Sequence, residues 1–359
     1  MQRVDAIVIG GGIMGAATAW WLARRGQDVT LLEQFEPGHV RGSSHGGSRI
    51  FRLAYPDPFW IDLARAARED WRELESETGD DLLVRTGSLD HGERAAVDGI
   101  AAALDVRRVR HDRLHPDAAT ERWPGVRFDG PVLHQPDGGR IAADRAWAAM
   151  WDRVRALGGI AHWSTPARAI EVIGDRARVA TDDETYDARV AVVAAGAWVV
   201  DLLRDTVPLP PLVVTQESAF HFAPRDDTPW PSFIHHGDVA RYGLETPGEG
   251  VKVAEHHTGP AVTADRRDFV VDAATRDRVA AFVRSWLPGL EPAPVSEVTC
   301  LYTSTVTEDF VLDRIGPIVV ASPCSGHGFK FAPTIGRLVA DLVTGAAPVP
   351  RFSLAEVRR

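Results

Sequence analysis

The fold is decided near the beginning of the chain, by residues 4–33, VDAIVIGGGIMGAATAWWLARRGQDVTLLE. This stretch reads as one β-α-β unit. It has a β-branched strand at residues 6–9, a G-x-G-x-x-G turn at 10–15, a helix at 16–25 and a second strand at 28–32. Short apolar runs of this kind are typical of parallel strands buried on both faces. The stretch therefore predicts a Rossmann-like α/β sheet.

The turn has the residue types that a dinucleotide needs. Gly10 permits the tight turn, Gly12 lets the backbone approach a pyrophosphate, and Gly15 lets the helix pack closely on the strand. The N-terminus of the helix offers free N–H groups and a partial positive charge to the phosphates. Glu33 follows the turn by roughly 20 residues, where a carboxylate can accept both ribose hydroxyls. Together these residues indicate a dinucleotide cofactor, without choosing between NAD and FAD.

Composition and charge argue against several classes of protein. The chain has 359 residues, 45% of them hydrophobic, which predicts two domains or one elaborate α/β domain. The net charge of −10 argues against nucleic acid or an anionic membrane as partner. The first strand of the β-α-β unit begins almost at Met1, which leaves no room for a signal peptide before it. No apolar run approaches the roughly 20 residues of a membrane span. We therefore expect a cytoplasmic protein without signal peptide, in which Cys300 and Cys324 stay reduced.

A second cofactor contact is expected far along the chain. A strand at residues 189–193 runs into Ala195 and Gly196, and small residues at a strand end let the backbone approach a ligand. A helix at 332–344 follows another buried strand, at 318–321, so its N-terminus presents N–H groups to the same cofactor. NAD dehydrogenases usually repeat the β-α-β unit instead. The pattern therefore favours FAD.

Cationic side chains stand in two unusual settings. Residues 34–48, rich in Gly, Ser and His, should lie over the cofactor, and they lead into Arg49 and Arg52 among apolar residues. Ordinary ion pairs are the alternative interpretation of these two arginines. Lys252 lies in a β-branched run at 250–254, where it is either a charge on an edge strand or a functional amine.

The rest of the chain predicts further helices and strands. Helices are expected at 63–77, over most of 91–126, at 144–157 with Asp144 as cap, and at 272–286. Strands are expected at 83–89, 167–172, 176–181, 215–222, 240–244, 298–303 and 310–313. Proline-rich segments at 208–211 and 291–294 are interpreted as crossings between domains.

With these segments, the whole chain resembles the monomeric sarcosine oxidase and N-methyltryptophan oxidase group of the D-amino-acid-oxidase-like flavoproteins. The resemblance runs from the first glycine turn to the helix at 332–344. It is carried by residues 42–46 (GSSHG) with Arg49 and Arg52, 122–125 (RWPG), 195–198 (AGAW), 250–256 (GVKVAEH), 300–303 (CLYT) and 325–330 (SGHGFK).

The resemblance implies a fold and a reaction. A Rossmann-like FAD-binding domain of residues 1–90, 138–212 and 298–359 is expected, with an antiparallel-sheet substrate domain of residues 91–137 and 213–297 inserted into it, so the fold is α/β at its centre and α+β overall. The implied reaction oxidises the secondary amine of a small amino acid. It consists of hydride transfer to flavin N5, hydrolysis of the imine and reoxidation by molecular oxygen, which gives hydrogen peroxide. A monomer is expected.

The resemblance also assigns roles to residues. Cys300 matches the cysteine that carries the flavin through a thioether, and Lys252 matches a lysine that promotes the reaction with oxygen. Arg52 and Lys330 match residues that hold the substrate carboxylate. Residues that match the lining of the flavin or the substrate are His45, Arg49, Tyr242, His256 and Tyr302. The expected contacts with FAD are Gly10, Gly12, Ile13, Met14, Gly15, Glu33, Gln34, Ser43, Ser44, Arg49, Ala167, Ala195, Gly196, Trp198, Cys300, Gly326, His327, Gly328, Phe329 and Lys330. No metal is expected.

Several positions depart from the family pattern. After Arg52 the family usually has a histidine, then Ala-Tyr and a glycine-rich loop, whereas residues 53–58 here are Leu-Ala-Tyr-Pro-Asp-Pro. We expect the stiffer Pro-Asp-Pro segment at 56–58 to alter the lid over the side-chain pocket. Gly47 stands where aspartate is common, and Glu255 replaces an aromatic or basic residue. Pro323 and Cys324 replace a small apolar pair. The flavin contacts and the carboxylate-binding residues are intact.

Four functions are weighed for the chain. The first is an N-methyl-amino-acid oxidase with covalent FAD, and the second is an oxidase of a cyclic secondary amine, such as proline or pipecolate, or of a larger biosynthetic amine. A flavin-binding redox protein without turnover would be expected to lose Lys252 or the pair Arg52 and Lys330, and this chain has all three. The helix at 332–344 and the contact expected at residues 195–196 argue against the fourth function, an NAD-dependent dehydrogenase.

The purified protein should be yellow, with one FAD per chain and no tightly bound NAD. The reason is the glycine turn, Glu33 and the second contact at residues 195–196. The visible absorbance spectrum and the identity of the nucleotide released by proteolysis check this. A colourless protein that binds NADH in a titration would contradict it.

Overall fold

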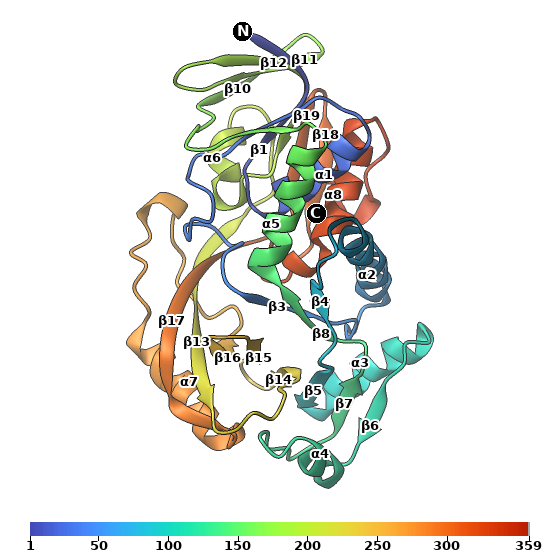
Figure 1. Cartoon of the computed structure of the whole chain (residues 1–359), viewed down its shortest axis with the longest axis vertical. Helices are drawn as coiled ribbons and strands as arrows, with labels where there is room; N and C mark the ends of the chain where they lie inside the picture. Colours follow the sequence, from blue (N-terminus) through green and yellow to red (C-terminus); the bar gives the residue numbers. More distant parts are fainter. Residues whose placement is uncertain (358–359) are drawn as a thin grey trace.

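The β-α-β unit lies at the centre of an eight-stranded sheet in the computed structural model, which describes residues 1–357 (Figure 1). β1 (Gln2–Ile9) pairs in parallel with β2 (Val29–Leu32) on one side and with β12 (Thr185–Val193) on the other. The helix α1 (Ile13–Arg24) connects β1 to β2, as the sequence predicts. The remaining strands of this sheet are β9 (Ile160–His162), β10 (Ala169–Ile173), β11 (Arg176–Ala180), β18 (Val311–Ile315) and β19 (Ile318–Ser322).

Long helices pack beside this sheet and form its main apolar core. α1 packs against α8 (Ala332–Val343) and α5 (Ala143–Ala156), and α2 (Pro58–Thr78) packs against both α8 and α5. Trp20 on α1 and Trp71 on α2 are fully buried. The indole Nε1 of Trp71 also donates a hydrogen bond to the carbonyl of Lys330, 2.8 Å away. This bond attaches α2 to the segment that precedes α8.

A second eight-stranded sheet forms the lower half of the molecule in Figure 1. Its order is β17-β13-β16-β15-β14-β5-β7-β6, and its pairs are antiparallel except β14 with β5. The bounds are β5 (Ser88–Gly92), β6 (Asp112–Leu114), β7 (Val132–Gln135), β13 (Val213–Pro224), β14 (Ser232–His236), β15 (Arg241–Thr246), β16 (Gly250–Glu255) and β17 (Leu290–Ser304).

Side-chain alternation gives this second sheet two different faces. Phe220, Phe222, Val251 and Val253 form an apolar cluster that includes α7 (Ala273–Trp286). The residues between them point the other way, because successive side chains of a strand alternate between the faces. That opposite face is the one that carries the polar residues singled out in the sequence.

Shorter elements join the two large sheets. A three-stranded sheet, β3 (Ser48–Phe51), β8 (Gly139–Ala142) and β4 (Leu83–Val84), lies between them in Figure 1. The remaining helices are α3 (Arg94–Val106), α4 (Pro116–Arg122), α6 (Val199–Leu203) and α9 (Leu354–Val357), with single 3₁₀ turns at Gly196–Trp198, Ala264–Arg266, Phe329–Phe331 and Pro350–Phe352.

Three expected elements differ in the structure. Residues 83–89 form β4 and part of β5, in two different sheets, because Gly87 turns the chain at φ +79°. Residues 91–126 are not helical throughout, since β6 lies between α3 and α4. Residues 291–294 lie inside β17 and not in a crossing. The prolines there fall where the register with β13 shifts, the kind of site at which a strand tolerates proline.

Two helix beginnings also differ from expectation. α5 begins after Ala142, so Asp144 lies in its first turn and is not its cap. Residues 56–58 begin α2: the Asp57 carboxylate accepts a hydrogen bond from the N–H of Phe59 at 2.9 Å, and Pro58 takes the first helical position. Proline is favoured there because its missing N–H would have no partner in the helix. The Pro-Asp-Pro segment therefore caps a helix.

No helix among residues 1–357 is both long and apolar enough to cross a bilayer. The expected boundaries of the two domains stay a prediction, since strand pairing alone does not define where the chain divides.

Replacing Gly336 with alanine should destabilise the protein. A Cβ on this α8 residue would lie 2.5 Å from backbone atoms of Ala17, so α1 and α8 would have to separate. Overpacking of this kind costs about 1–3 kcal/mol, more than alanine gains in helix propensity. The free energy of unfolding in urea measures it. Gly99→Ala is the matched control, because Gly99 is exposed on α3 with open space around its Cα and should lose no stability.

Candidate active site

A cavity of about 1040 Å³ lies between the two large sheets. It is lined by the first glycine turn, by residues 38–52, by the ends of β2 and β12, by the polar face of the second sheet and by the segment before α8. Every candidate site residue from the sequence lines it except Gly15. A Cβ on Gly15 would lie 1.8 Å from the carbonyl oxygen of Gly10, so Gly15 serves the packing of α1 on the turn. The volume is at the upper end of the range for cofactor sites.

The dinucleotide end of the cavity is built by close backbone approach. Gly10 has φ +107°, and a Cβ there would lie 2.4 Å from the carbonyl oxygen of Ala194. The two small-residue contacts predicted from the sequence therefore meet. Ser44 accepts a hydrogen bond from the N–H of Ile13 at 3.0 Å, which fixes the loop over the first turn of α1. Trp147, which sequence reasoning missed, donates from Nε1 to the carbonyl of Gly11 at 2.8 Å.

Glu33 stands at the end of β2, where the sequence placed it. Its carboxylate accepts hydrogen bonds from the N–H of Gly11 at 2.6 Å and from the N–H of Phe35 at 2.9 Å. An ionised carboxylate has about four acceptor positions, so two remain for ribose hydroxyls. The cradle of the turn, the acid at the strand end and the cavity volume together fit an adenine dinucleotide.

Arg49 organises the loop that covers the cavity. Its guanidinium donates to three carbonyl oxygens, those of Ser43 and Ser48 at 2.9 Å and that of His45 at 2.6 Å. Its Cζ also lies 5.2 Å from the ring centroid of Phe329. This guanidinium is thus committed to backbone acceptors, and the interpretation of Arg49 as a member of an ordinary ion pair is wrong.

Lys252 points into the cavity from the middle of the second sheet. β16 lies between β13 and β15, so the interpretation of Lys252 as an edge-strand charge is wrong. Its Nζ donates to the carbonyl of Ser48 at 3.2 Å. Burial lowers the pKa of Lys252 to about 7, and the positive charge of Arg49 contributes to the decrease. The buried ring of His221, opposite Lys252 in β13, lines the same region and was not predicted.

Arg52 and Lys330 lie at the same tyrosine ring. The Cζ of Arg52 is 4.5 Å from the ring centroid of Tyr55, and the Nζ of Lys330 is 5.6 Å from that centroid. Lys330 Nζ donates to the carbonyl of His327 at 2.7 Å. Burial and the nearby guanidinium of Arg52 lower the pKa of Lys330 well below its usual value. An anion between these two cations would be stabilised by both.

Burial shifts the pKa of several imidazole and phenol groups of the cavity away from neutral pH. Burial lowers the pKa of His45 to about 4 and that of His256 to about 3, and it raises the pKa of Tyr242 well above its usual value. The Nδ1 of His256 is 3.4 Å from the hydroxyl of Tyr302. A Cβ on Gly326, which has φ +74°, would lie 2.5 Å from the Tyr302 ring. Glycine at this position therefore allows the segment before α8 to approach both rings.

The two cysteines both line the cavity and have different surroundings. Cys300 lies on β17 opposite Glu217 of β13. The thiol sulfur of Cys324 accepts a hydrogen bond from the N–H of Thr303 at 3.3 Å. Burial raises the pKa of both thiols, and Arg49 opposes the rise at each.

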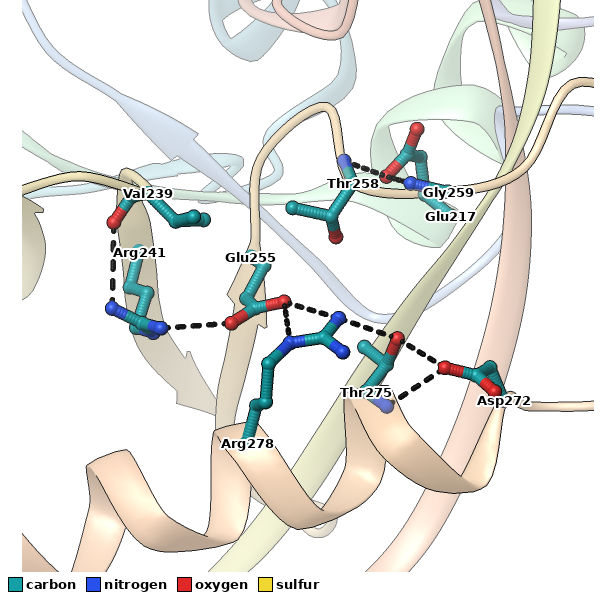
Figure 2. A network of polar contacts seen from close by, with 9 residues as sticks. All are labelled: Glu217, Val239, Arg241, Glu255, Thr258, Gly259, Asp272, Thr275 and Arg278. Atoms are coloured by element: carbon teal, nitrogen blue, oxygen red, sulfur yellow. Dashed lines mark hydrogen bonds and ion pairs between the residues drawn. The ribbon is translucent and has the colours of Figure 1, made fainter.

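Glu255 lies beside His256 in the sequence but faces away from the cavity, toward α7 (Figure 2). Its carboxylate is buried and accepts from Arg241 at 2.9 Å and from Arg278 at 2.8 Å. Figure 2 also shows Glu217, which accepts from the N–H groups of Thr258 and Gly259, 3.2 and 3.0 Å away. The departure at Glu255 thus builds an ion-pair network toward α7, in which Arg241 also lines the cavity.

Of the other departures, Pro323 and Cys324 line the cavity, whereas Gly47 does not. Residues 56–58 do not line the cavity, although Tyr55 does. A Cβ on Gly47 would lie 2.6 Å from Oε1 of Glu249, so glycine makes room for that carboxylate. Side-chain nitrogen and oxygen atoms of three neighbouring residues, His256, His257 and Glu308, lie within 4.8 Å of one another. Nε2 of His257 is 3.4 Å from Oε1 of Glu308.

Known proteins are similar to this chain over nearly its whole length. The family described as FAD dependent oxidoreductase matches residues 5–342. The peroxisomal sarcosine oxidase of Homo sapiens is 35% identical over 99% of this chain and 95% of its own length. The monomeric sarcosine oxidase of Bacillus sp. (strain NS-129) is 30% identical over 99% of this chain and 96% of its own length. A solved structure of NikD, "an unusual amino acid oxidase essential for nikkomycin biosynthesis", has a TM-score of 0.90 at 27% identity and covers 99% of this chain and 98% of its own.

Proposed function

The chain belongs to the FAD-dependent oxidoreductase family, and on that premise we propose that it is an oxidase of small secondary amino acids, of the N-methyl-amino-acid type. The observation that carries this function is the convergence of three sites on one cavity. These are the dinucleotide cradle at Gly10, the cation pair Arg52 and Lys330, and the buried amine of Lys252. The two sarcosine oxidases, similar over nearly their full length, support the same reaction.

FAD is the cofactor that the cradle would hold. The turn at residues 10–15, Glu33 and Ser44 would contact its adenosine and phosphates, and residues 326–330 would lie along its other end. When bound, FAD supplies the acceptor for a hydride equivalent from the carbon beside the amine and returns the electrons to dioxygen, with hydrogen peroxide as product. The remaining chemistry falls to the side chains of the cavity.

Arg52 and Lys330 would bind the carboxylate of the substrate. A guanidinium can donate to both carboxylate oxygens, while an ammonium acts as a point charge beside it. Binding an anion also favours the charged form of Lys330, whose pKa burial holds down. The uncharged imidazole of His256 and the hydroxyl of Tyr302 can then accept or donate hydrogen bonds near the amine without adding a charge.

Lys252 would promote the reaction with oxygen. Dioxygen is neutral and gains negative charge as it takes electrons. A fixed ammonium in a site with little water stabilises that charge strongly, because no solvent must reorganise. The amine is held on an interior strand between apolar Val251 and Val253, which face the other side of the sheet.

Three finer features remain proposals. FAD would be attached covalently through Cys300, and the protein would be a monomer in the cytoplasm. The printed name of the Bacillus relative, monomeric sarcosine oxidase, supports the oligomeric state.

A second candidate is the oxidation of a cyclic secondary amine or of a larger biosynthetic amine. The similarity to NikD, with a TM-score of 0.90, favours keeping it. Both candidates use the same carboxylate site and differ only in what the rest of the pocket accepts.

A peroxide assay over a panel of amines tests the function. N-methylglycine, longer N-methyl amino acids, proline and pipecolate should be compared with matched amines that lack the carboxylate. Arg52→Ala should lower kcat/KM for amino acids by roughly ten- to a hundredfold, because it removes charged hydrogen bonds worth about 1.5–3 kcal/mol each. An equal loss for the matched amines, or no peroxide from any amino acid, would contradict the proposal.

FAD should stay attached to Cys300 after denaturation in acid. A thioether resists reducing agents, so the mass of the intact protein should exceed that of the chain by one FAD. Cys300→Ser should abolish the increase, and Cys324→Ser should leave it in place. Release of the flavin from the wild type, or its transfer to Cys324, would show that the assignment is wrong.

Lys252→Met should slow reoxidation by oxygen by about 10²–10³, the loss that follows removal of one preorganised polar group. Anaerobic reduction by substrate should change little, because methionine keeps the length of the side chain. The pKa of Lys252 is lowered to about 7, so its charged form is present below that pH and is lost above it. Reoxidation of the wild type should therefore slow as pH rises through 7, and that of the variant should not. Stopped-flow absorbance separates the two half-reactions; a block of reduction alone would make Lys252 a substrate residue.

A further inference from the structure

Asp90 is a buried acid on the cavity face of the second sheet. β5 pairs in parallel with β14, with Asp90 opposite Ile234, and Ile234 in turn is opposite Tyr242 of β15. Directly opposed residues point to the same face of a sheet, and both Ile234 and Tyr242 line the cavity. β5, β14 and β15 are neighbours in this sheet (Figure 1). The register therefore places Asp90 on the polar face, beyond the end of the cavity lining.

The carboxylate of Asp90 contacts the arginine of the proposed carboxylate site. Its Oδ1 is 3.5 Å from Nη1 of Arg52 and 2.9 Å from Nε2 of His236, which can donate a hydrogen bond to it. Asp90 is 0% exposed, and the Arg52 side chain is 15% exposed. No hydrogen bond reaches Oδ2 of Asp90 from the residues that the structure describes. His236 itself lines the cavity.

A buried carboxylate is unfavourable unless its charge is compensated. Here the compensating cation is Arg52, which lies near the same Tyr55 ring as Lys330 and is repelled by the charged form of that lysine. Without an anion beside it, the guanidinium would be driven away from Lys330. With Asp90 at one nitrogen and the Tyr55 ring on its face, the plane of the guanidinium is defined by two contacts. Its other nitrogens are then free for a ligand.

We propose that Asp90 is a positioning residue for substrate binding: it orients Arg52 for the substrate carboxylate, and His236 holds Asp90 in place. This inference rests on the proposed function, because it assumes that Arg52 binds a carboxylate. It adds to the site a residue of β5, a strand in which no motif of the sequence indicated a function. The acid acts through Arg52 and does not touch the substrate.

A double-mutant cycle between Asp90 and Arg52 tests the role. The variants are Asp90→Leu, Asp90→Asn, Arg52→Ala and the combination of Asp90→Leu with Arg52→Ala. Binding is measured by titrating the holoenzyme with methoxyacetate, the oxygen analogue of N-methylglycine, which lacks the oxidisable amine. Calorimetry gives the dissociation constant without turnover. KM and kcat for N-methylglycine are measured in parallel.

Asp90→Leu should weaken methoxyacetate binding and raise KM by about tenfold, with a smaller change in kcat, because an unanchored guanidinium loses its orientation. Asp90→Asn should recover part of the loss, since its amide oxygen still accepts a hydrogen bond. In the Arg52→Ala background, Asp90→Leu should have no further effect on binding. The proposal would be overturned if both Asp90 variants bound methoxyacetate as tightly as the wild type or more tightly. It would also be overturned if Asp90→Leu caused the same loss of binding in the Arg52→Ala background as in the wild type.

Asp70→Asn is the matched control. Asp70 is also a buried acid paired with an arginine, Arg337 at 3.2 Å, but neither residue lines the cavity. Its variant should lower the unfolding temperature without changing methoxyacetate affinity; a change equal to that of Asp90→Asn would mark the effect as general destabilisation and overturn the proposal. If the wild type neither binds methoxyacetate nor oxidises any amino acid, the proposed function fails. If the wild type does both and the cycle shows no coupling between Asp90 and Arg52, only the inference about Asp90 fails.

Discussion

The constraint on which the site depends is the enclosure of four cations, Arg49, Arg52, Lys252 and Lys330, around one cavity of a chain with net charge −10. Burial in the cavity disfavours the charged form of each side chain, and it lowers the pKa of both lysines for this reason. The arginines keep their charge, one bonded to backbone carbonyls and the other beside Asp90. The part of the cavity around these four groups favours anionic groups, which a flavin dinucleotide has in its phosphates and an amino acid has in its carboxylate.

The second sheet brings these groups together through its register. Lys252 is opposite His221 in one direction and Leu244 in the other, while Ala254, two residues on, is in line with Tyr242. Because side chains alternate, the same strands also build an apolar and ion-paired face toward α7. Glu255 and His256 are neighbours in the chain, yet one stabilises the sheet and the other lines the cavity. A shift of one residue in the pairing of these strands would move the side chains of each face to the other.

The dinucleotide end rests on close approach of backbones, which is why glycine recurs there. Gly10 allows the turn to contact the end of β12, and Gly336 allows α8 to contact α1. The same close packing of α8 fixes the segment at 326–330, to which Trp71 adds a hydrogen bond at the carbonyl of Lys330. The core helices α1, α2 and α8 therefore support the segment that carries Lys330.

The sequence by itself determined the β-α-β unit, FAD as the favoured cofactor and a set of candidate residues that, apart from Gly15, all line the cavity. These signals are local: they consist of glycine spacing, strand patterns and short motifs. The sequence misjudged 83–89, 91–126 and 291–294, where turns, bulges and pairing across distant segments decide. Only the tertiary structure decided that Lys252 is interior, that Glu255 faces away from the site, and that Asp90 meets Arg52. Each of these depends on strand order and register, which long-range pairing sets and no local pattern encodes.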